Sequence, residues 1–143
     1  MATNNTLRTA VYDVEIGKFY SAILDYGNYP KFIEGVDDIE VLEQSESSAR
    51  VRYSLNVVKR FVYTLALTHT PNSKVSWKLE SGDLFKTNEG EWILKDLGDG
   101  QTEVTYSIEL AFKLMVPKMI LKKLVGSNLP AMMDSMADEA RKR

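Results

Sequence analysis

The chain has 143 residues, of which 44% are hydrophobic and 27% charged, and its formal net charge is −2. This composition is typical of one folded domain over residues 1–143 and excludes a disordered or fibrous chain. The weak negative charge argues against a nucleic-acid partner, and the absence of cysteine excludes disulfides, thiolate nucleophiles and cysteine-bound zinc. Without a secretory leader or an apolar run of membrane-spanning length, we expect a cytoplasmic protein, with room for transient membrane contact.

The first third of the chain predicts a short strand followed by a helix. Residues 7–13 have the pattern of a strand. Residues 14–26 place apolar side chains three and four positions apart, as an amphipathic helix does. Asp13 is the predicted N-cap of this helix.

The stretch DYGNYPKF follows that helix and gathers an acid, two tyrosines, a glycine and a proline. We interpret it as a corner of the chain and not as a reactive cluster. Gly27–Asn28 is expected to end the helix in the left-handed conformation, and Tyr29 is expected to be extended because it precedes Pro30. Pro30 can begin a second short helix, while Tyr29 and Phe32 serve as apolar anchors.

The middle of the chain alternates between apolar and polar residues, which is the period of half-buried strands. Short turn signals separate the runs, so neighbouring strands are antiparallel, because a parallel pair needs a long crossover. The predicted strands lie near 38–44 and at 49–57, 60–69, 74–81, 90–97 and 102–112.

The last part of the chain changes to a helical period. An apolar stripe predicts a long helix over 117–143 that begins at Pro117. Pro130 is expected to kink this helix near Gly126. The whole order of elements is that of an α+β protein, in which the terminal helix covers the apolar face of the sheet.

Strand alternation also assigns the inner face of the sheet. If the apolar parity faces the terminal helix, nearly all charged strand residues take the opposite face. The space between sheet and helix is then apolar, with a few phenol and indole groups that need hydrogen-bond partners. Space left between sheet and helix would form a ligand cavity.

Several motifs identify the chain as similar to a known superfamily. They are AILDYGNYPKFIEGV, WKLESGDLFKTNEGEWIL, TEVTYSIEL and VPKMILKKLVGSNLPAMMDSM. The chain resembles the START-like (SRPBCC) superfamily, specifically its polyketide cyclase/dehydrase and coenzyme Q-binding branch, which also contains bacterial ribosome-association toxins. The resemblance implies a helix-grip fold, with a curved antiparallel sheet of about six or seven strands around the C-terminal helix and one or two short helices after the first strand.

This fold implies an elongated apolar pocket between the sheet and the C-terminal helix. The residues predicted to contact a ligand combine the inner parity of the strands with the apolar stripe of the helix. They are Tyr53, Leu55, Phe61, Tyr63, Leu65, Leu67, Trp77, Leu79, Trp92, Leu94, Tyr106, Ile108, Leu110, Leu124, Met132 and Met136.

Acid–base chemistry has few candidates in this sequence. His69 is the only histidine, and its position at a strand end beside a turn favours a rim residue without a catalytic role. Asp96 and the inward tyrosines are the other groups that a catalytic site would need. We predict no catalytic residue, no metal site and no cofactor.

Three functions remain as hypotheses. The leading one is binding, carriage or sensing of a small hydrophobic molecule such as a lipid, an isoprenoid quinone or a polyketide. The alternatives are a cyclase or dehydratase acting on a hydrophobic substrate, and a protein-binding role like that of the ribosome-association toxins. The last would use a basic patch from Lys118, Lys122, Lys123, Arg141, Lys142 and Arg143. The sequence does not indicate an oligomeric state.

Overall fold

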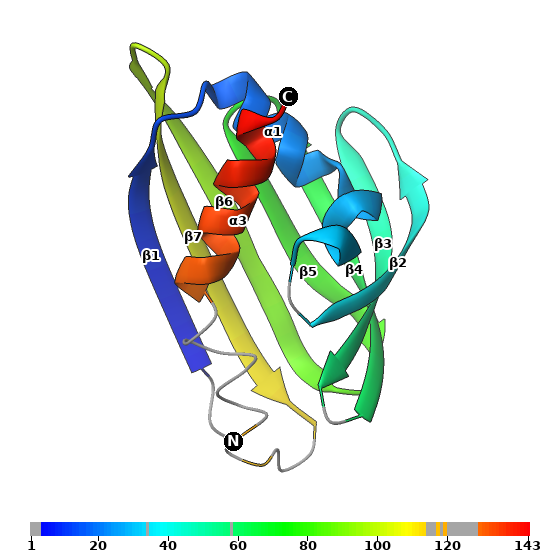
Figure 1. The fold of residues 1–143 in the computed structure, drawn as a ribbon. Helices are drawn as coiled ribbons and strands as arrows, with labels where there is room; N and C mark the ends of the chain where they lie inside the picture. The colour runs from blue at the N-terminus through cyan, green and yellow to red at the C-terminus, as the bar shows by residue number, and fades with distance from the viewer. Residues whose placement is uncertain (1–3, 34, 58, 114–116, 118, 120–128) are drawn as a thin grey trace.

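One curved sheet encloses the helices of this protein (Figure 1). The computed structural model describes residues 4–33, 35–57, 59–113, 117, 119 and 129–143. The elements in chain order are β1 (Asn4–Tyr12), α1 (Ile16–Leu24), the 3₁₀-helix η1 (Tyr26–Lys31), β2 (Val36–Gln44), β3 (Ser48–Val57), β4 (Lys59–Thr70), β5 (Lys74–Gly82), β6 (Phe85–Gly98), β7 (Gln101–Phe112) and α3 (Leu129–Arg141).

The sheet has seven strands in the order β1-β7-β6-β5-β4-β3-β2, and every neighbouring pair is antiparallel. Figure 1 shows α1 and α3 on the same side of this sheet, inside its curve. The predicted α+β helix-grip fold, with its antiparallel sheet, short helices after the first strand and C-terminal helix, is confirmed. Among the described residues, no helix combines the length and the apolar character that a membrane crossing requires.

Polar contacts attach α3 to the first third of the chain. The Tyr12 hydroxyl donates a 2.7 Å hydrogen bond to Asp134, and the Asn28 amide donates one of 2.8 Å to Glu139. Arg143 forms an ion pair of 2.6 Å with Asp25. The apolar face of α3 is buried against the sheet and α1, so the helix is fixed on both of its sides.

The region around α1 differs from the prediction at its caps. The N-cap is Glu15 and not Asp13, and its side chain makes no capping hydrogen bond. Gly27–Asn28 does not adopt the left-handed conformation, because the chain continues directly from α1 into η1. Tyr29 is part of η1 and not extended, and Pro30 lies inside this helix. A short 3₁₀-helix tolerates this proline, because such a helix contains few backbone N–H to C=O hydrogen bonds.

The expected anchoring role of this corner is confirmed. Tyr29 is buried, and Phe32 packs against the core with its ring 5.9 Å from that of Tyr29. The Tyr29 hydroxyl also donates to the carbonyl of Ile23. The corner therefore fixes α1 and η1 over the sheet.

The predicted strands are confirmed, and their ends agree within two residues except at two strand starts. β1 begins at Asn4 and not at residue 7, and β6 begins at Phe85 and not at residue 90. The early part of β6 pairs with the end of β7, a long-range partner that local alternation does not reveal. At the C-terminus, Pro130 is the second residue of α3, and the expected helix start at Pro117 and kink at Gly126 involve residues 118 and 120–128, outside the described residues.

Candidate ligand cavity

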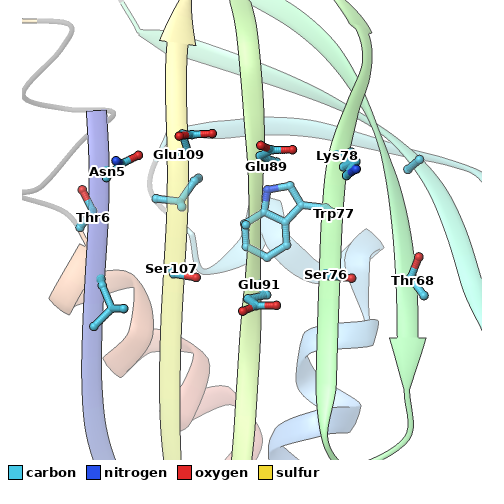
Figure 2. Close-up of a pocket in the computed structure, with 14 residues that line it drawn as sticks. Asn5, Thr6, Thr68, Ser76, Trp77, Lys78, Glu89, Glu91, Ser107 and Glu109 are labelled. Carbon is cyan, nitrogen blue, oxygen red and sulfur yellow. The ribbon is translucent and has the colours of Figure 1, made fainter. Parts of the chain in front are cut away.

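Among the described residues, one hollow lies on the outer face of the sheet and another on the inner face. The outer one has a volume of about 620 Å³ and is lined by residues of β1, β7, β6, β5 and β4 (Figure 2). The inner one has a volume of about 140 Å³ and lies between the sheet and the helices. Their chemistry differs, and this difference decides which of them suits an apolar ligand.

The lining of the outer cleft includes charged and polar side chains. Figure 2 shows Glu89 and Glu109 on neighbouring strands, where they are direct cross-strand partners, with Lys78 on β5 beside them. In the next row Glu91 is the cross-strand partner of both Ser107 and Ser76, and Thr68 pairs with Ser76. Among the described residues, no group of three or more histidine, aspartate, glutamate or cysteine side chains has a geometry suited to a metal ion.

The inner cavity is apolar and is lined by core residues. Its described lining contains no aspartate, glutamate, lysine or arginine. Side chains from α1, η1, six strands and α3 contribute to its wall. The lining residues are Ile23, Tyr26, Tyr29, Ile33, Val36, Tyr53, Tyr63, Leu65, Leu67, Val75, Trp77, Asn88, Trp92, Tyr106, Ile108, Met132 and Met136.

Strand register brings the aromatic groups of this wall together. Tyr53 and Tyr63 are cross-strand partners on β3 and β4, and their rings stack with centroids 5.2 Å apart. Tyr106 on β7 is the partner of Trp92 on β6, and these rings meet edge to face at 4.7 Å. Alternate residues of each strand point to one face, so the apolar parity of the sequence becomes the cavity wall.

Three phenol groups of the wall are available as hydrogen-bond donors. The hydroxyls of Tyr53, Tyr63 and Tyr106 have no hydrogen-bond partner among the described residues, although each residue is largely removed from solvent. Burial raises the pKa of all three above the ordinary value of 10.0, so they stay protonated near neutral pH. They can donate to an oxygen atom of a ligand, but at this pH they cannot compensate a negative charge as a cation would.

Trp77 connects the two faces. The pairs of β5 and β6 run from Lys74–Ile93 to Trp77–Gly90, and the Trp77 indole donates a 3.1 Å hydrogen bond to Asn88 just beyond the last pair. Its ring lies close to Gly90, where a side chain would collide with it. Trp77 therefore lies between the inner cavity and the outer cleft and lines both.

The structure brings most of the predicted ligand contacts into one wall. Those that line the cavity are Tyr53, Tyr63, Leu65, Leu67, Trp77, Trp92, Tyr106, Ile108, Met132 and Met136. Others lie away from it, because strand parity gives the face of a residue but not its position along the sheet. These are Leu55, Phe61, Leu94 and Leu110, which are buried in the core, and the half-buried Leu79. Leu124 lies outside the described residues.

Sequence reasoning missed the part of the wall that the first helices contribute. Tyr26, Tyr29, Ile23 and Ile33 come from α1, η1 and the chain that follows, and Val36 begins β2. The anchoring role of Tyr29 pointed to this region, but not to the cavity. Val75 had the inward parity without being selected, and Asn88 preceded the predicted start of its strand.

Two candidates for acid–base chemistry have unexpected environments. His69 lies near the end of β4, as expected, but it is only 4% exposed and not at a rim. Its Nε2 atom is 2.9 Å from the hydroxyl of Tyr26. Asp96 is exposed and accepts a 2.9 Å hydrogen bond from the backbone N–H of Gly98, so it stabilises the β6–β7 turn and lies outside the cavity.

The C-terminal part of the expected basic patch is neutralised. Arg141 pairs with Asp138 at 2.7 Å, and Lys142 pairs with Glu139 at 3.4 Å. Arg143 is held by Asp25. Lys118, Lys122 and Lys123 lie outside the described residues.

A curved sheet closed around a C-terminal helix, with an apolar cavity between them, defines a START-like protein of the helix-grip type. The chain belongs to the polyketide cyclase/dehydrase and lipid transport family, whose model matches residues 13–137. It is also 24% identical over 137 residues to the ribosome association toxin RatA of Pseudomonas aeruginosa, covering 94% of this chain and 93% of the relative.

Solved structures share the fold over nearly the whole chain. The Zhui aromatase/cyclase from Streptomyces sp. R1128 superposes with a TM-score of 0.85 at 15% identity, covering 99% of this chain and 96% of that protein. A START superfamily protein from Mycobacterium smegmatis gives a TM-score of 0.80 at 19% identity, with coverage of 96% and 97%. At these identities the likeness concerns the fold and not the ligand.

Proposed function

We propose that this protein binds a small, neutral, carbonyl-bearing apolar molecule, of the quinone or polyketide kind, in its inner cavity. The observation that carries the proposal is the combination of an apolar wall without charged groups and three phenol hydroxyls in that wall that have no partner among the described residues. A ligand oxygen or an ordered water could accept a hydrogen bond from each of them.

The same wall argues against an anionic lipid. A fatty-acid carboxylate inside the cavity would lose its hydration, and the described lining offers no cation to compensate it. A neutral ketone or quinone loses less hydration and gains hydrogen bonds from Tyr53, Tyr63 or Tyr106. We therefore place carriage or sensing of such a molecule, in the cytoplasm, ahead of carriage of free fatty acids.

Calorimetric titration tests this choice. The purified protein is titrated with 2-methyl-1,4-naphthoquinone and, separately, with a medium-chain fatty acid. We expect the quinone to bind more tightly, and Tyr63→Phe to weaken its binding by roughly 3- to 10-fold, since it removes one hydrogen bond. Tyr12→Phe is the matched control, because the Tyr12 hydroxyl bonds Asp134 outside the cavity. Tighter binding of the fatty acid, or an equal loss in both variants, would contradict the proposal.

A second candidate function is association with ribosomes. It is supported by the curated relative, which carries that role in its name and matches this chain over almost its full length. The net charge of −2 and the paired C-terminal basic residues give it no electrostatic support. Co-sedimentation of the purified protein with ribosomes at low and at high salt tests it, and a protein that stays in the supernatant at both concentrations counts against it.

A further inference from the structure

The sheet is open, and its two edge strands differ in how well they are protected from pairing with another chain. β1 and β2 are the first and last strands in the sheet order, so each has one side without a partner strand among the described residues. Figure 1 shows β1 at one margin of the sheet. The unpaired N–H and C=O groups of an edge strand can pair with a strand of another molecule unless charges, prolines or bulges prevent it.

The β2 edge carries such protection. Its sequence VDDIEVLEQ contains four acids, Asp37, Asp38, Glu40 and Glu43. Its pairing with β3 also has two register shifts. Charged side chains and bulges both disfavour the addition of a further strand. The β2 edge is therefore unsuited to pairing with a second copy of itself.

The β1 edge lacks these features. Its nine residues pair with β7 without a register shift. The sequence NNTLRTAVY contains no proline and one charged residue, Arg8. The Arg8 side chain turns to the inner face, where it donates hydrogen bonds of 3.1 Å to the Tyr12 hydroxyl and 3.4 Å to the Met133 sulfur. The free side of β1 is therefore a regular backbone edge with little charge beside it.

The outward side chains of β1 add an apolar surface to this edge. Leu7 is 70% exposed and Val11 is 53% exposed, and the exposed Thr9 lies between them on the same face. Ala10 and Tyr12, which have the opposite parity, belong to the core or pack against it. A long edge strand with exposed apolar side chains is a surface on which a further strand can add.

We propose that β1 pairs antiparallel with β1 of a second copy of this chain, with Thr9 opposite Thr9 on the two-fold axis. The two sheets then form one continuous sheet, with the helices of both copies on the same side. Leu7 of each copy lies opposite Val11 of the other, so the apolar side chains cover each other on the outer face. Arg8 lies opposite the small Ala10, which leaves space for its guanidinium group.

Neighbouring registers are less favourable. A pairing centred on Arg8 places two arginines directly opposite each other, and like charges in that position are destabilising. A pairing centred on Ala10 places Leu7 opposite Asp13, so that an apolar side chain meets a carboxylate. Centring on Thr9 separates the arginines and joins the apolar residues, which selects this register.

Disulfide crosslinking tests the register. The chain contains no cysteine, so one introduced thiol can pair only with its copy in a second molecule. We expect Thr9→Cys to form a covalent dimer on mild oxidation at least about 10-fold faster than Thr68→Cys, because directly opposite residues of antiparallel strands are close enough for a disulfide. Thr68 is the matched control, since it is an exposed threonine on the outer face of β4.

Non-reducing electrophoresis measures these rates. Equal rates for the two variants would overturn the proposed pairing. Faster crosslinking of Arg8→Cys than of Thr9→Cys would overturn the register, because it would place Arg8 on the two-fold axis.

Sedimentation equilibrium tests the dimer without a crosslink. One strand pair buries less surface than a standard interface, so we expect a weak dimer whose fraction rises between micromolar and millimolar protein. Leu7→Lys should weaken dimerisation by about 10-fold or more, because each copy brings a charge to the apolar contact. Val41→Lys is the matched control on the β2 edge, where Val41 is 40% exposed, and it should dimerise as the wild type does.

A wild-type protein that stays monomeric at millimolar concentration would overturn the proposal, as would equal weakening in the two lysine variants. The outcome does not depend on the proposed function, since β1 contributes no residue to the described lining of the inner cavity. Leu7→Lys should therefore bind the quinone as the wild type does. A protein that dimerises without binding the quinone, or binds it without dimerising, separates the two proposals.

Discussion

The two faces of the sheet are made by alternate residues of the same strands, yet their chemistry is opposite. The inner face carries phenols and apolar side chains without a charged group in the described cavity wall. The outer face carries charges in pairs, such as Arg50 with Glu43 and Glu80, and Arg52 with Glu40. Exposed ion pairs contribute little to stability, so burial of the inner face supplies most of the stabilising free energy of the sheet.

The two faces also differ in hydrogen bonding: some polar groups already have a partner, and others have a donor that could bond a ligand. On the outer face the polar groups meet each other or water. On the inner face the phenol groups of Tyr53, Tyr63 and Tyr106 line the cavity without a hydrogen-bond partner among the described residues. This difference indicates that the inner space is suited to a ligand and not only to packing.

The largest effect should come from moving a charge across the sheet. Val75→Asp places a carboxylate on the inner face, where Val75 is 1% exposed, and should cost several kcal/mol of unfolding free energy or prevent folding. Ser76→Asp makes the same change one residue later, on the outer face, and should cost about 1 kcal/mol or less. Urea unfolding of both variants measures this, and similar losses would mean that the faces are wrongly assigned.

A smaller but still large effect should follow from a methyl group at Gly90. An added Cβ would collide with the carbonyl of Ser107 and lie 2.8 Å from the Trp77 ring, so Gly90→Ala should lower the unfolding free energy by roughly 1–3 kcal/mol. Gly27→Ala is the matched control, since nothing lies within 4 Å of its added Cβ. Thermal unfolding of both variants tests this close approach, and equal stability of the two would contradict it.

The smallest effect concerns pH. Burial lowers the pKa of His69 below 6.5, so as the pH falls through that value the unfolded chain takes up a proton that the folded chain does not, and stability decreases. His69→Gln should flatten this decrease between about pH 7 and pH 5.5, above the range of ordinary carboxylates. Urea unfolding at both pH values measures the slope. If the slope is the same in both proteins, His69 is not held neutral by the fold.

The sequence was sufficient to predict the architecture because local patterns of apolar and polar residues determine most of the strands and helices. Alternation in residues such as Val51, Tyr53 and Leu55 reports burial on one face, and short turns force antiparallel pairing. The sequence did not predict the early part of β6. This part is a strand because it pairs with the end of β7, which is distant in the sequence.

The candidate site was predictable in its chemistry and less so in its limits. Parity identified the phenols and indoles, but Leu55 and Leu94 share that parity and lie outside the cavity, because their position depends on the curvature of the sheet. The predicted left-handed helix stop at Gly27–Asn28 was wrong for a related reason. Packing of Tyr29 favours a 3₁₀ turn over the local preference for a helix stop. The contact of His69 with Tyr26 has no local signature at all.

The most direct test of the central claim uses the methionine methyl groups as reporters inside the cavity. Met132 and Met136 line the inner cavity, whereas Met119 is 64% exposed. In protein labelled with ¹³C at the methionine methyls, addition of 2-methyl-1,4-naphthoquinone should shift the signals of Met132 and Met136 and leave that of Met119 unchanged. A shift confined to Met119, or no shift at concentrations well above the calorimetric Kd, would contradict ligand binding between the sheet and α3.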